Sequence, residues 1–209
     1  MLPLWVLMAV LVAALLGAHH ANRPRLEWLL KPAAALTFVA AGIAAGGLSS
    51  TFGRVLVLGL VLAAAGDVLL IPKSKAAFLG GLVAFLLGHV AYAVAFALAG
   101  MRASAAAITA VAGTVAATFV LRWLWPHVER PMRVPVVAYV LVITTMVALA
   151  AGAASEHRSW ALLVGAVAFY LSDLSVARDR FVAPGFANRV WGLPLYFFAQ
   201  LLLASQAGR

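Results

Sequence analysis

Residues Gly59 to Leu70 read GLVLAAAGDVLL, and one acid, Asp67, interrupts this otherwise uncharged apolar run. A second apolar run follows after a short break, and its segment from Phe78 to Tyr92 carries His89 and ends on Tyr92. Both runs are apolar all round, which is typical of helices inside a membrane. A carboxylate at that depth is costly, so Asp67 marks a candidate functional site.

The composition of the whole chain is typical of a membrane protein. Hydrophobic residues make up 66% of the 209 positions and charged residues 10%, against roughly 45–50% and about 25% in soluble domains. The net charge is +9, but the basic residues lie in short segments between apolar runs. Such segments are topology signals and headgroup contacts, so we expect no nucleic-acid partner. The chain has no cysteine, which excludes disulfides and thiolate chemistry.

Eight apolar runs are long enough for transmembrane helices, each of which needs about 20 residues. The runs are continuous and lack period-2 alternation, which excludes spanning strands. The expected helices are 2–18, 31–48, 54–71, 76–99, 104–124, 134–153, 159–177 and 190–207. We therefore predict an all-α polytopic membrane protein whose residues 1–209 form a single transmembrane domain, with eight transmembrane helices in one bundle. The first run is expected to be a retained helix and not a signal peptide.

The distribution of basic residues predicts the orientation. With eight helices, 11 of the 15 Lys and Arg residues fall on one side of the membrane. Basic loops stay in the cytoplasm, so we expect both termini on the non-cytoplasmic side. The expected location is the cytoplasmic (inner) membrane of a bacterium.

This topology brings two acids to the same depth. Asp67 on the third helix and Asp173 on the seventh each lie about four residues from the cytoplasmic end, roughly 6–8 Å inside at 1.5 Å per residue. Tyr196 and Gln200 are one turn apart on the eighth helix and share a face. His89 lies deeper, near the middle of the fourth helix. We expect these polar groups to line one site.

The two acids also indicate an internal repeat. Each follows a small residue, lies on the third helix of a four-helix half, and precedes a tyrosine on the next helix by 25 and 23 positions. These spacings suggest a four-plus-four parallel repeat about an axis along the membrane normal. Such an axis would bring Asp67 and Asp173 face to face.

Structural roles are open for the same residues. Asp67 can pair with nearby lysines, Asp173 with Arg178, and His89 can bond a neighbouring helix. Metal binding needs several convergent ligands, and the sequence has no ligand motif, so we expect no metal.

Several short motifs occur in a specific order. They are Lys31-Pro32, Gly66-Asp67-Val68-Leu69-Leu70, Phe78-Leu79-Gly80-Gly81-Leu82, His89-Val90-Ala91-Tyr92, Ser172-Asp173, and the segment from Tyr196 to Ala204. In these motifs the chain resembles the YhhN family, which includes the lysoplasmalogenases, over about Lys31 to Ala204. The resemblance implies an eight-helix hydrolase that cleaves the vinyl ether of a lysoplasmalogen. The products would be a fatty aldehyde and glycerophosphoethanolamine or glycerophosphocholine.

The implied reaction assigns roles to the polar residues. Vinyl ether cleavage protonates the β-carbon and adds water to the α-carbon, and two carboxyls that share a proton suit these steps. We therefore expect Asp67 and Asp173 to be the catalytic acid–base pair, without any cofactor. Water, the glycerol hydroxyl and the phosphate would be held by the remaining site residues. These substrate-binding candidates are Lys31, His89, Tyr92, Ser172, Tyr196 and Gln200, with Lys73, Arg178 and Arg189 as further phosphate-binding cations.

The expected partners are a lysophospholipid substrate and membrane lipids. Another function is open on the same residues, namely a proton-coupled transporter of a small molecule or lipid, because intramembrane acids also bind protons and cations. A carrier would open its cavity alternately to both sides, whereas a hydrolase would keep one cavity at the cytoplasmic end. A third interpretation, a scaffold with structural acids, predicts that neutralising both acids changes stability alone.

Overall fold

The computed structural model describes residues 1–72 and 74–209, and Lys73 lies outside the described residues. The described part of the chain is all helical, which confirms the expected fold class. Seven of the helices are long and apolar enough to cross a membrane, and the more polar α8 is not among these seven. The helices are α1 (Leu2–His20), α2 (Pro24–Ala44), α3 (Thr51–Leu69), α4 (Lys75–Leu98), α5 (Ala103–Leu124), α6 (Arg130–His157), α7 (Trp160–Ala177) and α8 (Phe186–Ala204).

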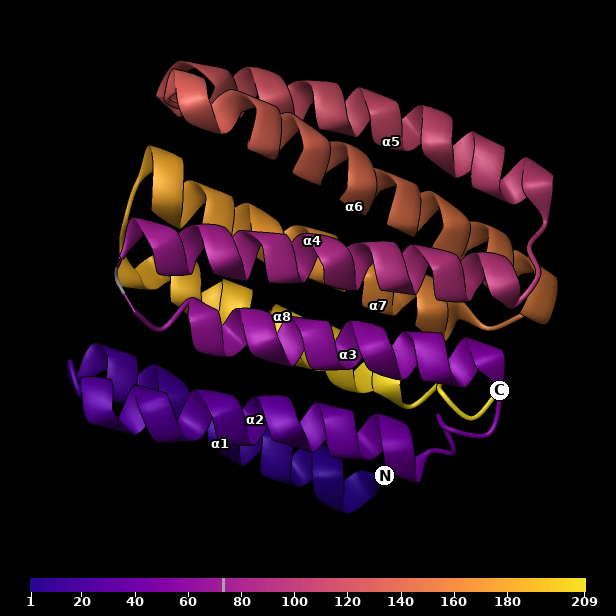
Figure 1. Ribbon diagram of the computed structural model, residues 1–209, viewed down its shortest axis with the longest axis horizontal. Coiled ribbons are helices and arrows are strands. Elements are labelled where there is room, and N and C mark those ends of the chain that lie inside the picture. Colours follow the sequence, from indigo (N-terminus) through magenta and orange to yellow (C-terminus); the bar gives the residue numbers. More distant parts are fainter. Residues whose placement is uncertain (73) are drawn as a thin grey trace.

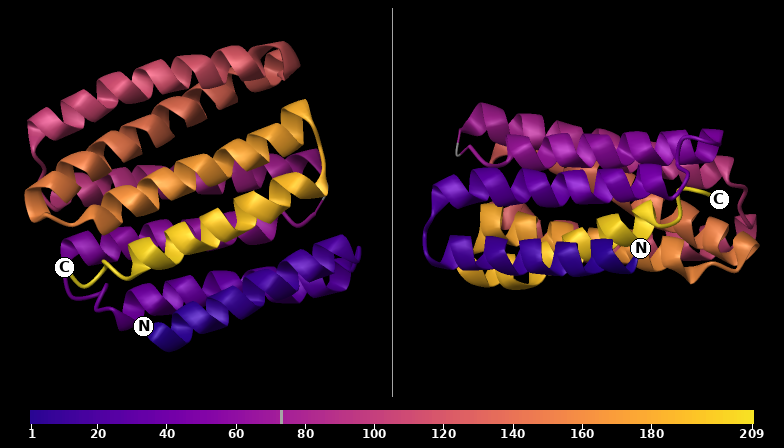
Figure 2. Two further views of the ribbon diagram at one scale, coloured as in Figure 1. Left: turned by 180° about the vertical axis from the view of Figure 1, so that it is seen from behind. Right: turned by 90° about the horizontal axis from the view of Figure 1, so that it is seen from below.

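The helices run roughly antiparallel in a bundle whose two termini lie at the same end (Figure 1). Helices α3 and α4 lie in front of α7 and α8, and the view from behind reverses this order (Figure 2). The pairs α1–α2 and α5–α6 flank this central group on opposite sides. The short connections α1–α2, α3–α4, α5–α6 and α7–α8 therefore gather at the end of the bundle opposite the termini.

The packing of the first four helices is repeated in the last four. Helix α1 packs on α2, α2 on α3 and α3 on α4, and α5, α6, α7 and α8 pack in the same succession. Across the halves, α2 contacts α8 just as α6 contacts α4. These neighbour relations are those of the parallel four-plus-four repeat that the positions of the acids suggested. Among the described residues they break down at α1 and α3, which both contact α8, whereas α5 and α7 have no comparable contact with α4.

Helix α2 begins at Pro24 rather than at residue 31 as expected. Pro24 occupies the first turn, where its missing N–H is harmless. Hydropathy locates only the apolar part of a helix, whereas α2 also includes a polar first turn with Glu27. Lys31 therefore lies two turns inside the helix, about 10 Å from its start at 1.5 Å per residue. That position brings its side chain within reach of Asp67, near the end of α3.

Other helix ends differ from the expected ones for similar reasons. Helices α6 and α8 begin at Arg130 and Phe186 rather than at residues 134 and 190, because each has a polar first turn. In α8 this first turn contains Asn188 and Arg189. Helix α2 ends at Ala44 rather than at residue 48, since Gly46 has a φ of 93°, a left-handed conformation that glycine adopts without strain.

Helices α3 and α4 approach each other closely because glycines line their contact. A Cβ atom on Gly59 would come within 2.5 Å of the Tyr92 ring, and one on Gly66 within 2.7 Å of the Phe85 ring. Lipid tails are as apolar as leucine side chains, so close packing of small residues is a main attraction between membrane helices. Because Gly66 directly precedes Asp67, the α3–α4 contact fixes the position of Asp67 along the bundle axis.

Substituting Gly59 with alanine is expected to destabilise the folded protein by about 1–3 kcal/mol, because the added methyl group would displace the buried Tyr92 ring. Thermal unfolding in detergent measures the effect. Gly80→Ala is the matched control, since its Cβ would meet Leu69 at an ordinary 3.6 Å and alanine has the higher helix propensity. Equal stability of the two variants would show that the α3–α4 contact can accommodate a methyl group at position 59.

Candidate active site

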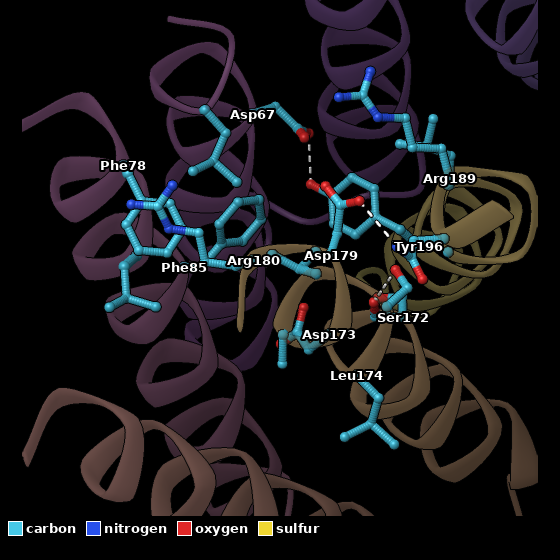
Figure 3. A pocket seen from close by; sticks show the side chains of 18 of the residues that line it. Asp67, Phe78, Phe85, Ser172, Asp173, Leu174, Asp179, Arg180, Arg189 and Tyr196 are labelled. Carbon is cyan, nitrogen blue, oxygen red and sulfur yellow. Dashed lines mark hydrogen bonds between the residues drawn. The ribbon is translucent and has the colours of Figure 1, made fainter. Parts of the chain in front are cut away.

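One cavity of about 650 Å³ contains both intramembrane acids. Its lining includes residues of the α1–α2, α3–α4 and α7–α8 connections, so it lies toward the end of the bundle away from the termini. Asp67 from α3 and Asp173 from α7 enter it from different sides (Figure 3). The volume lies within the range of about 300–1,000 Å³ that is usual for small-ligand sites.

Asp67 is buried and has a donor at each carboxyl oxygen. Its Oδ1 lies 3.3 Å from Lys31 Nζ on α2, and the Tyr196 hydroxyl on α8 donates to Oδ2 at 2.6 Å (Figure 3). Only 2% of the residue is exposed. A neighbouring ammonium group and a hydroxyl donor both stabilise a carboxylate. Asp67 therefore lies at the wall of the cavity between an ammonium group and a phenol donor.

Asp173 has different partners, and both approach the same oxygen. The Tyr139 hydroxyl on α6 donates to Asp173 Oδ2 at 2.8 Å, and His89 Nε2 on α4 lies 3.4 Å from that atom. No hydrogen bond or ion pair engages Oδ1 within residues 1–72 and 74–209. The side chain is 17% exposed to the cavity. Asp173 thus presents an oxygen that a ligand can reach.

His89 is fully buried and backs Asp173 rather than lining the cavity. Its Nδ1 lies 2.6 Å from the Phe85 carbonyl oxygen, which only accepts hydrogen bonds, so Nδ1 carries a proton. In the neutral ring Nε2 then bears a lone pair, and this atom has no hydrogen-bond partner in the described part of the chain. The 3.4 Å contact with Asp173 is thus a close approach that becomes an ion pair only if the ring is protonated.

The two carboxyls occupy equivalent places in the repeat but have different chemistry around them. Helices α2 and α8 supply the groups at Asp67, and the equivalent helices α6 and α4 supply those at Asp173. At Asp67 these groups are an ammonium and a phenol. At Asp173 they are a phenol and an imidazole. The repeat thus places one carboxyl beside a cation and the other beside uncharged groups.

Of the two catalytic and six substrate-binding candidates, five line the cavity and three do not, and of the further cations Arg189 lines it, whereas Lys73 lies outside the described residues. Asp67, Asp173, Lys31, Tyr196 and Ser172 are among its lining residues. The Ser172 hydroxyl, however, donates to the Phe169 carbonyl of its own helix. His89, Tyr92 and Gln200 are fully buried outside the cavity.

Tyr92 and Gln200 bind each other instead of facing a ligand. The Tyr92 hydroxyl on α4 donates to Gln200 Oε1 on α8 at 2.6 Å. Gln200 Nε2 has no partner among the described residues. Neither side chain therefore lines the cavity, where both were expected to bind the substrate. Their hydrogen bond joins the first and second halves of the bundle outside the cavity.

Tyr139 was missed in the sequence although it contacts Asp173. It precedes Asp173 by 34 positions, and Lys31 precedes Asp67 by a similar 36. The internal repeat was therefore a usable signal for a polar partner on the sixth helix. Tyr139 alone gives no functional signal, because a tyrosine in an apolar helix usually packs with its hydroxyl bonded to a neighbour.

The connection between α7 and α8 forms a polar wall that the sequence also did not reveal. The Asn188 side chain, which is buried, donates to Asp179 Oδ1 at 2.9 Å and to the Ala183 carbonyl oxygen at 2.8 Å. The Gly185 N–H donates to the same Asp179 oxygen. Arg178 donates to Asn188 and does not line the cavity, so it is not placed to hold a ligand phosphate. No group of three or more metal-ligating side chains occurs in the part of the chain that the structure describes.

Comparison with known proteins identifies relatives over most of the chain. A family model described as the YhhN family matches residues 26–207. A lysoplasmalogenase from Mycobacterium bovis is 35% identical over 162 residues, which cover 73% of this chain and 59% of that protein. Lysoplasmalogenase TMEM86A from Bos taurus is 31% identical over 158 residues, 72% of this chain and 63% of the relative. Lysoplasmalogenase TMEM86B from Homo sapiens is 32% identical over 163 residues, which cover 77% of this chain and 66% of that protein.

This chain thus spans about three fifths of the length of the mycobacterial relative. The match to the family model covers the whole segment from Lys31 to Ala204 in which the motifs were found, so the expected resemblance is confirmed. No solved structure gives a significant match.

Proposed function

The chain belongs to the YhhN family, and on this premise we propose that it is a membrane-embedded hydrolase that cleaves the vinyl ether bond of lysoplasmalogens. Relatives that bear the name lysoplasmalogenase support the reaction class. The observation that carries the proposal is a single cavity with two carboxyls, one paired with an ammonium group and the other with one oxygen open to a ligand. The products would be a fatty aldehyde and glycerophosphoethanolamine or glycerophosphocholine.

The first step is protonation of the vinyl ether at its β-carbon. Asp173, as the neutral carboxylic acid, donates the proton from Oδ1, and the π electrons form the new C–H bond. Tyr139 holds Oδ2 and so directs Oδ1 toward the cavity. The α-carbon becomes an oxocarbenium ion, and the Asp67 carboxylate stabilises its positive charge. Glycoside hydrolases stabilise a similar cation between two carboxyl groups.

The second step adds water to the α-carbon. Asp67 accepts a proton from the water as the new C–O bond forms, which gives a hemiacetal. In the collapse of the hemiacetal, Asp67 returns this proton to the departing glycerol oxygen, and the hemiacetal hydroxyl gives its proton to Asp173. Both carboxyls regain their starting protonation states, and one water is consumed for each aldehyde released.

Lys31 has another role than the phosphate binding expected from the sequence. Its ammonium group lies 3.3 Å from Asp67 Oδ1, and only 10% of its side chain is exposed. A buried carboxylate needs such a partner to stay charged. We assign Lys31 to keeping Asp67 anionic.

The test is to incubate the purified protein with matched alkenyl and acyl lysophospholipids and to identify the released chain by mass spectrometry. Release of fatty aldehyde from the alkenyl lipid supports the proposal. Release of fatty acid from the acyl lipid alone would replace it with an ester hydrolase. No release from either lipid, under conditions where the protein is folded, would contradict hydrolysis.

A proton-coupled carrier is the rival function, and the repeat in the packing favours it. Carrier activity predicts uptake into vesicles that depends on a pH gradient. A protein that releases aldehyde and shows no such uptake is a hydrolase. We further propose that the protein lies in the inner membrane of a bacterium with both termini outside the cytoplasm, which would place the cavity at the cytoplasmic end.

A further inference from the structure

The cavity has two parts of different chemistry on either side of the acids. The part formed by α1, α2 and the start of α8, which we call the polar wing, adjoins Asp67. Its lining side chains are mostly polar or charged and include His19, Asn22, Arg23, Glu27, Lys31 and Arg189.

The other part, the apolar wing, is formed by α4, α5, α6 and α7 and adjoins Asp173. Its lining side chains are mostly hydrocarbon and include Leu82, Val120, Leu124, Val136, Val140 and Ile143. Its border with the α7–α8 connection is more polar, since the Arg180 guanidinium lies 4.3 Å from the centre of the Phe78 ring. A packed cluster of Leu124, Val128 and Val136 borders this wing where the end of α5 meets the start of α6. One end of the cavity therefore suits a charged group and the other a hydrocarbon chain.

Arg23 and Arg189 both line the polar wing, and Arg189 is the less exposed of the two. It contacts His19 Nδ1, and because a guanidinium only donates, Nδ1 acts as the acceptor there. Glu27 Oε2 lies 3.7 Å from the same ring nitrogen, which then has no proton to share with it. Within residues 1–72 and 74–209, no carboxylate forms an ion pair with Arg189. Its charge is therefore available to a ligand phosphate, for which guanidinium groups are well suited.

From this division we propose, on the basis of the proposed function, that a single-chain phospholipid lies across the two acids in one direction. Its phosphate binds Arg189 in the polar wing, and its hydrocarbon chain fills the apolar wing. The β-carbon of the vinyl ether lies on the hydrocarbon-chain side of the α-carbon, so it meets Asp173. The glycerol oxygen lies on the headgroup side and meets Asp67. In this direction Asp173 donates the proton to the β-carbon, and Asp67, beside the Lys31 ammonium group, acts at the glycerol oxygen.

The apolar wing then sets chain-length preference. Val120 lies on α5, a helix that supplies neither acid nor any of their contacts. Val120→Trp is expected to lower kcat/KM for a substrate of about 18 carbons at least about tenfold more than kcat/KM for a substrate of about 8 carbons. Val111→Trp is the matched control, because Val111 is 69% exposed on the same helix. An equal loss for both chain lengths, or an unchanged preference, would overturn the placement of the chain.

The polar wing has its own test in binding. Arg189→Met is expected to weaken binding of a saturated 1-alkyl lysophospholipid about tenfold or more, since a lost charge-assisted contact costs about 1.5–3 kcal/mol. Binding of the matching alkylglycerol, which lacks phosphate, should not change. Arg25→Met is the control, because Arg25 is exposed and does not line the cavity. A similar loss for both ligands would show that Arg189 does not recognise phosphate.

A photolabelling experiment separates this inference from the proposed function. The probe is the saturated 1-alkyl lysophospholipid with a diazirine in mid-chain, which cannot be hydrolysed at a vinyl ether. We expect labelled peptides from residues 120–143. Labelling there without aldehyde release from the alkenyl lipid would support the binding direction and contradict the hydrolase. Aldehyde release with labelling of residues 19–31 instead would support the hydrolase and overturn the direction.

Discussion

Asp173→Asn is expected to lower kcat/KM for aldehyde release by about 10²–10⁴-fold, the usual contribution of a general acid. An amide has no acidic proton to give to the β-carbon. It keeps the shape of the carboxyl, and its oxygen can still accept the hydrogen bond from the Tyr139 hydroxyl that Oδ2 now accepts at 2.8 Å. Activity should therefore fall without loss of the fold. Initial rates of aldehyde formation and thermal unfolding in detergent measure the two effects.

The matched control for Asp173→Asn is Glu156→Gln. Glu156 is an exposed acid, and its contact is an ion pair with Arg102 at 3.9 Å outside the cavity. Its neutralisation should leave turnover unchanged. Asp67→Asn should also abolish aldehyde release, because an amide cannot accept the proton of the attacking water. If Asp173→Asn kept wild-type turnover while folded, Asp173 would be a structural acid and the proton would have to come from another group.

The positions of the two acids could be predicted from the sequence because acids are rare in apolar runs. Asp67 and Asp173 were expected at one depth, and both line the same cavity. Distance from the end of an apolar run gives depth directly, since every residue of a helix adds the same rise. The resemblance to the YhhN family marked the same two residues, so two independent arguments pointed to them.

The direction in which each side chain points could not be predicted in this way. Helices such as α3 and α4 are apolar on all sides, so no polar face shows which side meets the lipid. Tyr92 and Gln200 were expected at the site but pair with each other. Tyr139 was overlooked although it binds Asp173.

Hydropathy also misplaced Lys31 within its helix. It marked the lysine as the start of α2, where an exposed cation would hold phosphate. The polar turn from Pro24 onward is part of the helix, so Lys31 is buried two turns inside it. The difference changes its proposed role, because a lysine at that depth meets a carboxylate of the protein before it meets a ligand.

Lys31→Met is therefore expected to reduce both stability and turnover. Removal of one partner leaves the other as a buried charge without compensation, which typically costs about 3–5 kcal/mol. Asp67, only 2% exposed, would either remain an unpaired buried carboxylate at this cost in stability or take up a proton. In the protonated form it can no longer accept a proton from water, so aldehyde release should fall about 10²-fold or more. Thermal unfolding and initial rates in the same detergent measure the two losses.

The double variant Lys31→Met with Asp67→Asn separates the two losses. Without a carboxylate the site holds no buried charge, and the amide oxygen can still accept from the Tyr196 hydroxyl that now lies 2.6 Å from Oδ2. Stability should therefore recover toward the wild-type value, because the effects of two contacting residues are not additive. Turnover should stay as low as in Asp67→Asn, since the proton acceptor is missing. A double variant as unstable as Lys31→Met alone would mean that Lys31 stabilises the bundle by packing and not by holding the charge of Asp67.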